Sequence, residues 1–268
     1  MSEIDFSIVT INYNNLSGLK KTMLSIQHII NDRVEWVVVD GGSVDGSVEL
    51  VSEAKEVSQF ISEADKGIYD AMNKGVKMST GKYIIFMNSG DTFSWQFSFD
   101  LLPTNLNANT VFYGDCLRNV GDIYYLDRVK DDTPKWWKNG IPCHQSIILP
   151  KQFLLENPFS LEYKIYADAE NVIKAFNALP IHSKTPVPIS IYEVGGISST
   201  AVKSFVSCKR KSQESAEAYG VVWTPFSKKF INSVIKHYLL HFLGVKRYYI
   251  ASYAIKAFLR AHDEKNCI

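Results

Sequence analysis

Short hydrophobic runs that end in polar residues alternate with stretches of helical spacing over the first ninety positions. The runs lie at residues 6–11, 35–40, 59–62 and 83–87. Between the last two, Ile68, Met72 and Val76 fall on one face of a helix. Strands that alternate with helices at this spacing predict parallel βαβ units, and therefore an α/β fold with a doubly wound sheet.

Two further helices are predicted in the same region. Ser17 is a residue type that caps helices, so we expect a helix that begins at Gly18. A second helix is expected over residues 47–54, directly after the glycine-rich turn at residues 41–46.

Beyond Asp91 the pattern becomes irregular and rich in aromatic residues. We expect two antiparallel strands at residues 111–115 and 123–126, further strands at 147–149 and 187–192, and a helix that opens at residues 166–168. The predicted organisation is a nucleotide-binding half over residues 1–91, an acceptor half over 92–200, and a helical tail over 201–268.

Composition is that of an ordinary globular protein, with 46% hydrophobic and 21% charged residues. The four cysteines share no CxxC spacing, which favours free thiols in a reducing compartment. No secretory signal is visible and no apolar stretch reaches the length of a membrane span, so we expect a cytoplasmic protein. The net charge of +1 gives no reason to expect a nucleic-acid partner.

The charge is unevenly distributed. Residues 201–268 contain 12 Lys and Arg against 4 Asp and Glu, a net charge of +8. Aromatic residues and cations alternate there at helical spacing, as in basic amphipathic helices that lie on an anionic membrane surface. The alternative is that these helices pack on the rest of the chain or on a second subunit in a homo-oligomer.

Three predicted strands end in polar residues, at 10–14, 40–43 and 88–91. Because carboxyl ends of parallel strands share one edge of a sheet, a ligand site is expected there. Asp40 precedes two glycines and can bind a nucleoside, although Asp also commonly caps such turns. Asp91 suits a hard cation such as Mg²⁺ or Mn²⁺ on a diphosphate. The turn is not a GxGxxG motif, no P-loop occurs, and no Cys/His cluster indicates zinc.

Several of these segments together resemble the family 2 glycosyltransferases, which have the GT-A fold. The resemblance lies in Thr10-Ile11-Asn12-Tyr13-Asn14, residues 38–46, Asp65 to Gly75 and Asn88-Ser89-Gly90-Asp91, and it continues through His144-Gln145, Ala167-Asp168 and residues 195–198. Bacterial enzymes of colanic acid, capsule and O-antigen (lipopolysaccharide) assembly are the most similar in these motifs. The fold implied is a mixed, mainly parallel sheet flanked by helices.

The resemblance implies a role for each of nine residues. The nucleotide-sugar contacts would be Thr10, Tyr13, Asp40, Asp65, Lys66, Asn88 and His144, the metal ligand Asp91, and the catalytic base Asp168. The family's usual pair of metal-binding acids is reduced here to Gly90-Asp91. Besides the turn cap already given for Asp40, alternatives remain for four residues: Asp91 as a surface turn residue, Asp168 as a helix N-cap, His144 as a structural or solvent-exposed histidine, and Lys66 as a solvated charge.

The resemblance also implies an activity. It is inverting transfer of a sugar from a nucleotide-diphosphate sugar, with UDP the commonest nucleotide, to a hydroxyl of a lipid-linked saccharide, with Mn²⁺ or Mg²⁺ as cofactor. Such an enzyme would work peripherally at the cytosolic face of the inner membrane. A nucleotide-sugar hydrolase, a nucleotidyltransferase and a non-catalytic binding scaffold are the alternatives. Trp136 and Trp137 could stack on a sugar ring or simply pack.

Overall fold

The computed structural model describes residues 3–121, 123–131, 133–138, 140–193, 205–220, 228–244, 247–252 and 254–255. The chain divides into two compact units. Unit 1 comprises Met1–Leu117 and Leu126–Tyr192, and unit 2 comprises Arg118–Tyr125 and Glu193–Ile268. The motif at residues 195–198 and the predicted domain boundary at residue 200 lie outside the described residues.

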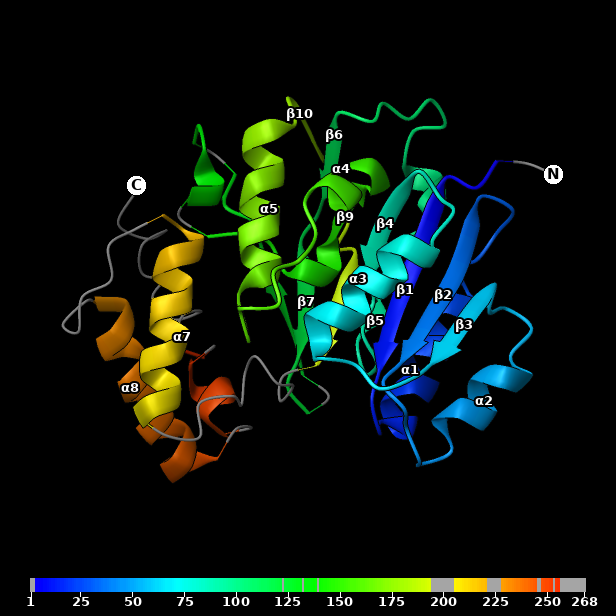
Figure 1. Ribbon diagram of the computed structural model, residues 1–268. Coiled ribbons are helices and arrows are strands. Elements are labelled where there is room, and N and C mark those ends of the chain that lie inside the picture. The colour runs from blue at the N-terminus through cyan, green and yellow to red at the C-terminus, as the bar shows by residue number, and fades with distance from the viewer. Residues whose placement is uncertain are drawn as a thin grey trace. The chain divides into compact units, whose positions relative to one another are not determined.

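Unit 1 is built on a seven-stranded sheet with the order β10-β6-β9-β4-β1-β2-β3 (Figure 1). Its first four strands in sequence are parallel: β1 (Phe6–Asn12), β2 (Val34–Asp40), β3 (Gln59–Ser62) and β4 (Tyr83–Phe86). The connecting helices are α1 (Leu16–Gln27), α2 (Ser47–Glu53) and α3 (Ile68–Met78). The predicted βαβ organisation is therefore confirmed.

The remaining strands make the sheet mixed. Strand β9 (Ile147–Pro150) is antiparallel to both β4 and β6 (Thr110–Tyr113), while β10 (Ile181–Lys184) is parallel to β6. Helices α4 (Lys151–Glu156) and α5 (Ala167–Ala178) complete this part of the unit. Short 3-10 helices occur at η1 (Phe99–Leu101), η2 (Trp136–Lys138) and η3 (His144–Ser146).

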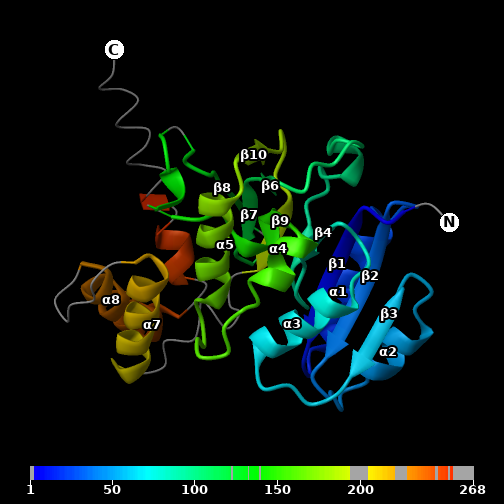
Figure 2. The same ribbon diagram turned by 45° about the horizontal axis from the view of Figure 1, so that its top comes forward.

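Alternating side chains of the central strands divide the core into two layers. Val9 and Ile11 of β1 face a cluster that includes residues of α3, α4 and α5, whereas Phe6 and Ile8 face a cluster with residues of α1 and α2. Figures 1 and 2 accordingly show α3 and α5 on the same side of the sheet. The close contact of α3 with β1 requires a glycine, because a Cβ at Gly75 would lie 2.4 Å from Val9 Cγ1.

Two local predictions are wrong. Helix α1 begins at Leu16 rather than Gly18, and its N-cap is Asn15, whose Oδ1 accepts a hydrogen bond from the Gly18 backbone N–H at 3.2 Å. The runs at 111–115 and 123–126 do not pair, because the fully buried β6 joins the main sheet. The half-exposed second run forms β8, in a smaller sheet of order β5-β11-β7-β8. The bounds of that sheet are β5 (Thr92–Phe93), β7 (Cys116–Asn119), β8 (Tyr124–Asp127) and β11 (Ser190–Glu193).

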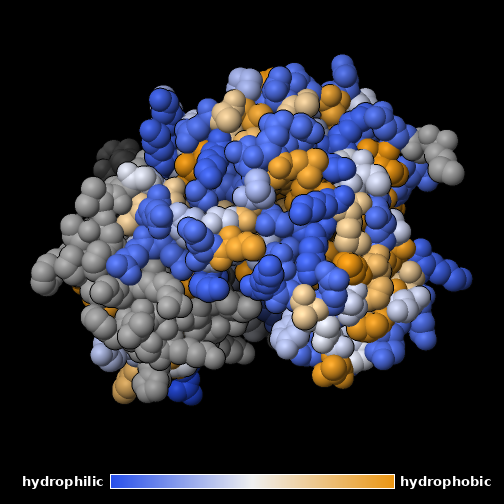
Figure 3. Space-filling view, viewed as in Figure 1, coloured by the Kyte–Doolittle hydropathy of each residue, from blue (hydrophilic) through white to orange (hydrophobic). Residues whose placement is uncertain are grey.

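The surface of unit 1 shows no continuous apolar band on the face seen in Figure 3. Hydrophobic residues form separate orange patches between hydrophilic blue ones. Scattered apolar side chains of this kind are normal on a solvated surface.

Unit 2 contains two longer helices, α7 (Phe205–Ala218) and α8 (Lys228–Leu243). Helix α8 carries three lysines and no acidic residue. Five of its large hydrophobic side chains are exposed, and their spacing places them along one stripe: Ile231, Ile235, Tyr238, Leu239 and Phe242. Among the described residues, no helix combines the length and apolarity needed to span a bilayer.

Candidate active site

The polar ends of β1 and β2 are tied together by Asp40. This carboxylate is almost completely buried and accepts five hydrogen bonds, from Asn12 Nδ2 (2.8 Å), Gly42 N (3.0 Å), Ser43 N (2.7 Å), Ser43 Oγ (2.6 Å) and Ser62 Oγ (2.7 Å). A carboxylate offers about four lone-pair directions, so Asp40 is saturated. As the structure stands, Asp40 therefore matches the turn-capping alternative and presents no free oxygen to a nucleoside.

These hydrogen bonds keep the Asp40 carboxyl group ionised. Burial alone would raise the pKa of the Asp40 carboxyl, but hydrogen bonds from Ser43, Asn12 and Ser62 hold that pKa below its ordinary value. Gly42 adopts a φ of 82°, which is the left-handed region that glycine enters without strain. The sequence Asp-Gly-Gly-Ser thus folds into a turn that wraps its own carboxylate.

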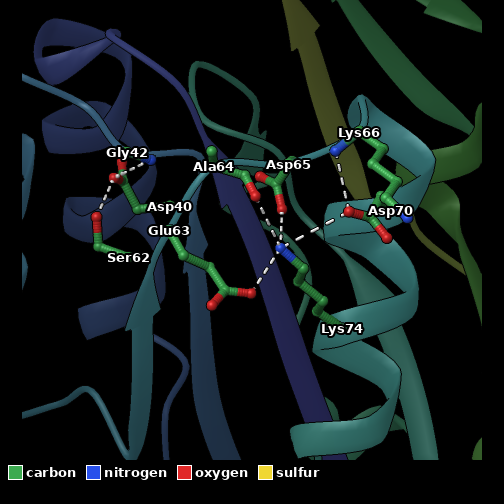
Figure 4. A network of polar contacts seen from close by, with 9 residues as sticks. All are labelled: Asp40, Gly42, Ser62, Glu63, Ala64, Asp65, Lys66, Asp70 and Lys74. Carbon is green, nitrogen blue, oxygen red and sulfur yellow. Dashed lines mark hydrogen bonds and ion pairs between the residues drawn. The ribbon is translucent and has the colours of Figure 1, made fainter.

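Beside this turn, Lys74 of α3 forms ion pairs with acidic residues that follow β3 (Figure 4). Its Nζ lies 2.6 Å from Asp65 Oδ1, 2.8 Å from Glu63 Oε1 and 3.7 Å from Asp70 Oδ2. The hydrogen bonds to Asp65 and Glu63 raise the pKa of Lys74, so it stays charged. We call Asp40, Ser62, Glu63, Asp65 and Lys74 the β2–β3 cluster.

Tyr13 and Asp65 approach each other over Gly41. A Cβ at Gly41 would lie 3.0 Å from Asp65 Oδ2 and 3.1 Å from Tyr13 Cδ2, so only glycine leaves both side chains in place. The Tyr13 ring is 68% exposed. Lys66 is also exposed and donates its backbone N–H to Asp70 Oδ2 at 3.0 Å. An exposed aromatic ring beside a fixed carboxylate forms a surface on which a planar base can stack and hydrogen-bond.

Thr10 does not reach this surface. The residue is fully buried, and its Oγ1 accepts a hydrogen bond from the Trp36 indole N–H at 2.9 Å. Its side chain lies on the same face of β1 as Phe6 and Ile8, because alternate residues of a strand share a face. Thr10 therefore stabilises the core on the α1 side and offers no exposed atom to a ligand.

At the end of β4, Asp91 is held by neighbours from two directions. Its Oδ2 accepts a hydrogen bond from Gln145 Nε2 at 2.7 Å, and its backbone carbonyl accepts one from Thr22 Oγ1 at 2.7 Å. Gly90, with a φ of 107°, provides the turn that places Asp91 there. The amide oxygen of Asn88 is buried without a hydrogen-bond partner among the described residues.

His144 precedes Gln145 in η3 and lies in an aromatic enclosure. Its ring stacks on Phe86 with centroids 5.2 Å apart and meets the edge of Phe159 at 6.0 Å. Burial lowers the pKa of His144, and the negative charge of Asp168 opposes that effect in part. The imidazole is therefore a buried, largely neutral group near Asp168.

Asp168 lies in the first turn of α5, close to α3. Its Oδ1 accepts hydrogen bonds from Tyr69 Oη at 3.1 Å and from the backbone N–H of Ala169 at 2.9 Å. Helix α5 begins with Tyr166 as its N-cap, and no side chain makes the capping hydrogen bond. The N-cap alternative for Asp168 is therefore wrong. We call Tyr69, Asp91, His144, Gln145 and Asp168 the η3 cluster.

Comparison with known proteins identifies the chain. A profile of the family described as Glycosyl transferase family 2 matches residues 7–139. A "PGL/p-HBAD biosynthesis glycosyltransferase" of Mycobacterium bovis is 29% identical over 215 residues, which cover 74% of this chain and 80% of that relative. The chain contains a glycosyl transferase family 2 domain.

Solved structures of glycosyltransferases share the fold. S. aureus TarS 1-349 in complex with UDP-GlcNAc superposes with a TM-score of 0.60 at 16% identity, covering 88% of this chain and 73% of that chain. The mannosyltransferase PcManGT of Pyrobaculum calidifontis, in complex with GDP-Man and Mn²⁺, gives a TM-score of 0.57 at 14% identity, with 98% and 80% covered. The protein is thus a glycosyltransferase with the GT-A fold.

In this glycosyltransferase, five of the nine predicted site residues fall into the two clusters. Asp40 and Asp65 lie in the β2–β3 cluster, whereas Asp91, His144 and Asp168 lie in the η3 cluster. Trp136 and Trp137 belong to neither. They are buried and pack on Phe176 of α5. The prediction that they simply pack is therefore confirmed, and the prediction that they stack on a sugar ring is wrong.

Three residues of the site were not singled out from the sequence. Tyr69 directly follows Ile68 at the start of the predicted apolar helix face, a position typical of a core residue, yet its hydroxyl contacts Asp168. Gln145 was noted only as part of His-Gln, and Lys74 only as part of a longer motif. The only sequence feature that marked these residues was their position next to residues already selected. Such a position identifies neighbours in sequence but does not predict contacts in space.

The residues at the end of β4 fit a divalent cation of the Mg²⁺ or Mn²⁺ type. Asp91 supplies a carboxylate, and the unpartnered amide oxygen of Asn88 supplies a second hard donor in the same turn. Within the described residues, no group of three or more His, Cys, Asp or Glu side chains could hold a metal by itself. Such a cation would therefore need oxygen ligands from water and a bound diphosphate as well.

Proposed function

We propose that this glycosyltransferase moves a sugar from a nucleotide-diphosphate sugar, with UDP the nucleotide, to a hydroxyl of a lipid-linked saccharide. The transfer inverts the configuration at the anomeric carbon. The product would belong to bacterial surface polysaccharide synthesis, such as that of O-antigen or capsule. The observation that carries the proposal is the η3 cluster. There Gln145 donates a hydrogen bond to Asp91, and the charge of Asp168 acts on the neighbouring His144.

The donor would bind across the carboxyl edge of the sheet. Tyr13 and Asp65 would contact the nucleobase, because an exposed ring and a fixed carboxylate converge over Gly41. Lys66 would meet the diphosphate from the entry to α3, and Asn88 and Asp91 would lie at its metal-binding end. TarS has been solved with UDP and with UDP-GlcNAc, which supports a UDP-sugar donor.

Asp168 would act as the general base. As the acceptor oxygen attacks the anomeric carbon, its proton passes to the Asp168 carboxylate, and the bond to the diphosphate breaks with its electron pair on the leaving group. A cation at Asn88 and Asp91 would neutralise charge that develops on that diphosphate. His144, kept largely neutral by burial, would serve as a hydrogen-bond partner beside the sugar rather than as a second positive charge.

The acceptor would be presented at an anionic membrane surface. The relatives named for PGL/p-HBAD biosynthesis and the exposed hydrophobic stripe of α8 both support this part of the proposal. Charge favours a membrane over a second copy of the chain, because residues 201–268 carry +8 and two such segments would repel each other. Attachment would then be peripheral, at the cytosolic face of the inner membrane.

A panel of nucleotide sugars tests the proposal. Purified protein is incubated with UDP-GlcNAc, UDP-glucose, UDP-galactose, GDP-mannose and dTDP-rhamnose, with and without Mn²⁺, and thermal unfolding is recorded. We expect one UDP-sugar to raise the unfolding temperature by several degrees, and more with Mn²⁺ than without. Transfer from that donor to a lipid-linked saccharide extract is then measured as glycoside product. Free sugar without glycoside would show hydrolysis and contradict the proposal.

A further inference from the structure

The two carboxylate oxygens of Asp168 are not equivalent. Oδ1 accepts the hydrogen bonds from Tyr69 Oη and from the Ala169 backbone N–H. Oδ2 accepts none from the described residues. A carboxylate whose one oxygen is fixed twice has its other oxygen fixed in direction as well, because the carboxyl group is planar.

Tyr69 is well suited to orient this group. The residue lies in the first turn of α3, is 5% exposed, and its ring stacks on Phe159 at 6.0 Å with an interplanar angle of 19°. Burial and the neighbouring charge of Asp168 raise the pKa of the Tyr69 phenol far above its ordinary value. Tyr69 therefore remains a hydrogen-bond donor throughout the neutral pH range.

We propose that Tyr69 is a positioning residue that binds Oδ1 of Asp168 and thereby directs Oδ2 at the acceptor hydroxyl. The inference rests on the proposed function of Asp168 as the base. In the reaction the acceptor O–H bond breaks, the proton goes to Oδ2, and the oxygen forms the new glycosidic bond while the diphosphate leaves. The donated hydrogen bond of Tyr69 is kept before and after this proton transfer.

The arrangement couples two parts of the site. Tyr69 stands on α3, directly after the Asp65-Lys66-Gly67 entry predicted to meet the donor, whereas Asp168 stands on α5. A small movement of the α3 N-terminus would therefore turn the base. Orientation of this kind acts on the rate of the chemical step more than on donor affinity, because Tyr69 has no exposed face for the donor.

The hydrogen bond from Tyr69 is also a main contact of the Asp168 carboxylate. The groups that face Asp168 are Tyr69 from α3 and His144 from η3, while Glu170 on α5 itself pairs with Lys174 at 2.9 Å. A neutral donor stabilises the charged form of a carboxylate. Removal of the Tyr69 hydroxyl leaves Oδ1 of Asp168 with the hydrogen bond from the Ala169 backbone N–H, so the carboxylate is held less firmly.

Tyr69→Phe tests the proposal, with Tyr113→Phe as a matched control. Tyr113 is equally buried and donates to Asp131 Oδ2 at 3.0 Å, so the control loses the same type of bond elsewhere. The first readout is the ¹³C NMR spectrum of the aspartate carboxyls at one neutral pH, in which the Asp168 signal is assigned by its loss in Asp168→Asn. No ligand is needed, so this readout is independent of the donor.

We expect the Asp168 carboxyl signal to change position in Tyr69→Phe and to stay in place in Tyr113→Phe. With the UDP-sugar found in the donor panel, or with UDP-GlcNAc if several bind, kcat should fall roughly tenfold in Tyr69→Phe while KM changes less than about twofold.

The outcomes separate the two levels of the account. If Asp168→Asn retains full transfer, the proposed base is wrong. If Asp168→Asn is inactive but Tyr69→Phe leaves both the Asp168 carboxyl signal and kcat unchanged, the base stands and the positioning role is overturned. In the Asp168→Asn background, addition of Tyr69→Phe should cause no further loss, because Tyr69 acts through Asp168.

Discussion

The β2–β3 cluster and the η3 cluster use the same residue type in opposite ways. In the first, Asp40 accepts five hydrogen bonds and Asp65 is paired with a charged lysine. In the second, Asp91 and Asp168 each accept a side-chain hydrogen bond from a neutral group, Gln145 and Tyr69 respectively. The difference teaches that a saturated carboxylate such as Asp40 holds a loop, whereas Asp168, with both of its hydrogen bonds on Oδ1, keeps Oδ2 for chemistry.

The largest expected effect concerns stability and lies in the β2–β3 cluster. Asp40→Ala leaves the buried donors of Ser43, Asn12 and Ser62 without their acceptor, so we expect unfolding to become easier by about 3 kcal/mol. Urea unfolding measures the change. A decrease of less than about 1 kcal/mol in the free energy of unfolding would mean that the β2–β3 cluster does not hold the loop. The contrast drawn here between the two clusters would then be wrong.

The pH dependence of stability has a definite sign for the same residue. Because the pKa of Asp40 is lower in the folded protein than in the unfolded chain, its contribution is complete above about pH 4, the ordinary range of an aspartate. That contribution is lost as the pH falls through the lower folded value. Urea midpoints measured from pH 6 to pH 2.5 should fall less steeply for Asp40→Asn than for the wild type.

Asp91→Asn probes the η3 cluster. The variant keeps the size of the side chain but removes the charge, so we expect about a 100-fold loss of transfer with little change in thermal stability. The additional stabilisation that Mn²⁺ gives with UDP should also disappear. Asp70→Asn is the control, since Asp70 belongs to the surroundings of Lys74. Full Mn²⁺ dependence in Asp91→Asn would place the cation elsewhere.

Lys74→Met should have a smaller effect, because the lysine forms partly solvated ion pairs. We expect a loss of about 1 kcal/mol in the free energy of unfolding and weaker binding of UDP, since Asp65 loses the partner that fixes it beside Tyr13. Calorimetric titration with UDP measures the second effect. Unchanged affinity for UDP would remove Asp65 from the nucleotide site.

The smallest effect is expected at the α8 stripe. Phe242 is 86% exposed, and Phe242→Ser should reduce cosedimentation with phosphatidylglycerol-containing vesicles by about threefold. Leu24→Ser, which removes a 60% exposed residue of α1, is the matched control and should leave binding unchanged. Equal vesicle binding by Phe242→Ser and the wild type would contradict a membrane surface at α8. Binding only to neutral phosphatidylcholine vesicles would contradict it as well.

The sequence predicted the fold well because hydrophobic spacing is a local signal. Strands such as Gln59–Ser62 and the alternation of strands with helices follow from that spacing alone. Prediction from the sequence failed where tertiary contacts determine the partner or the start of an element. The partner of β6 depends on burial within the main sheet, and the start of α1 depends on Asn15 rather than the nearby Ser17.

The site was predicted in part for the same reason. Acidic and glycine-rich strand ends selected Asp40, Asp91 and Asp168 as candidates, but no sequence pattern shows whether a carboxylate is saturated. That property depends on residues remote in sequence, such as Ser62 for Asp40 and Tyr69 for Asp168. Burial likewise removed Thr10, Trp136 and Trp137 from the predicted contacts.

The most direct test of the central claim is the transfer rate of Asp168→Asn, measured on the same sample as its thermal unfolding. If Asp168 is the base, transfer falls about 1,000-fold while the unfolding temperature changes by no more than about 2 °C. Glu170→Gln, two residues further along α5, should retain near wild-type transfer. A folded Asp168→Asn protein that transfers sugar at the wild-type rate would contradict the account.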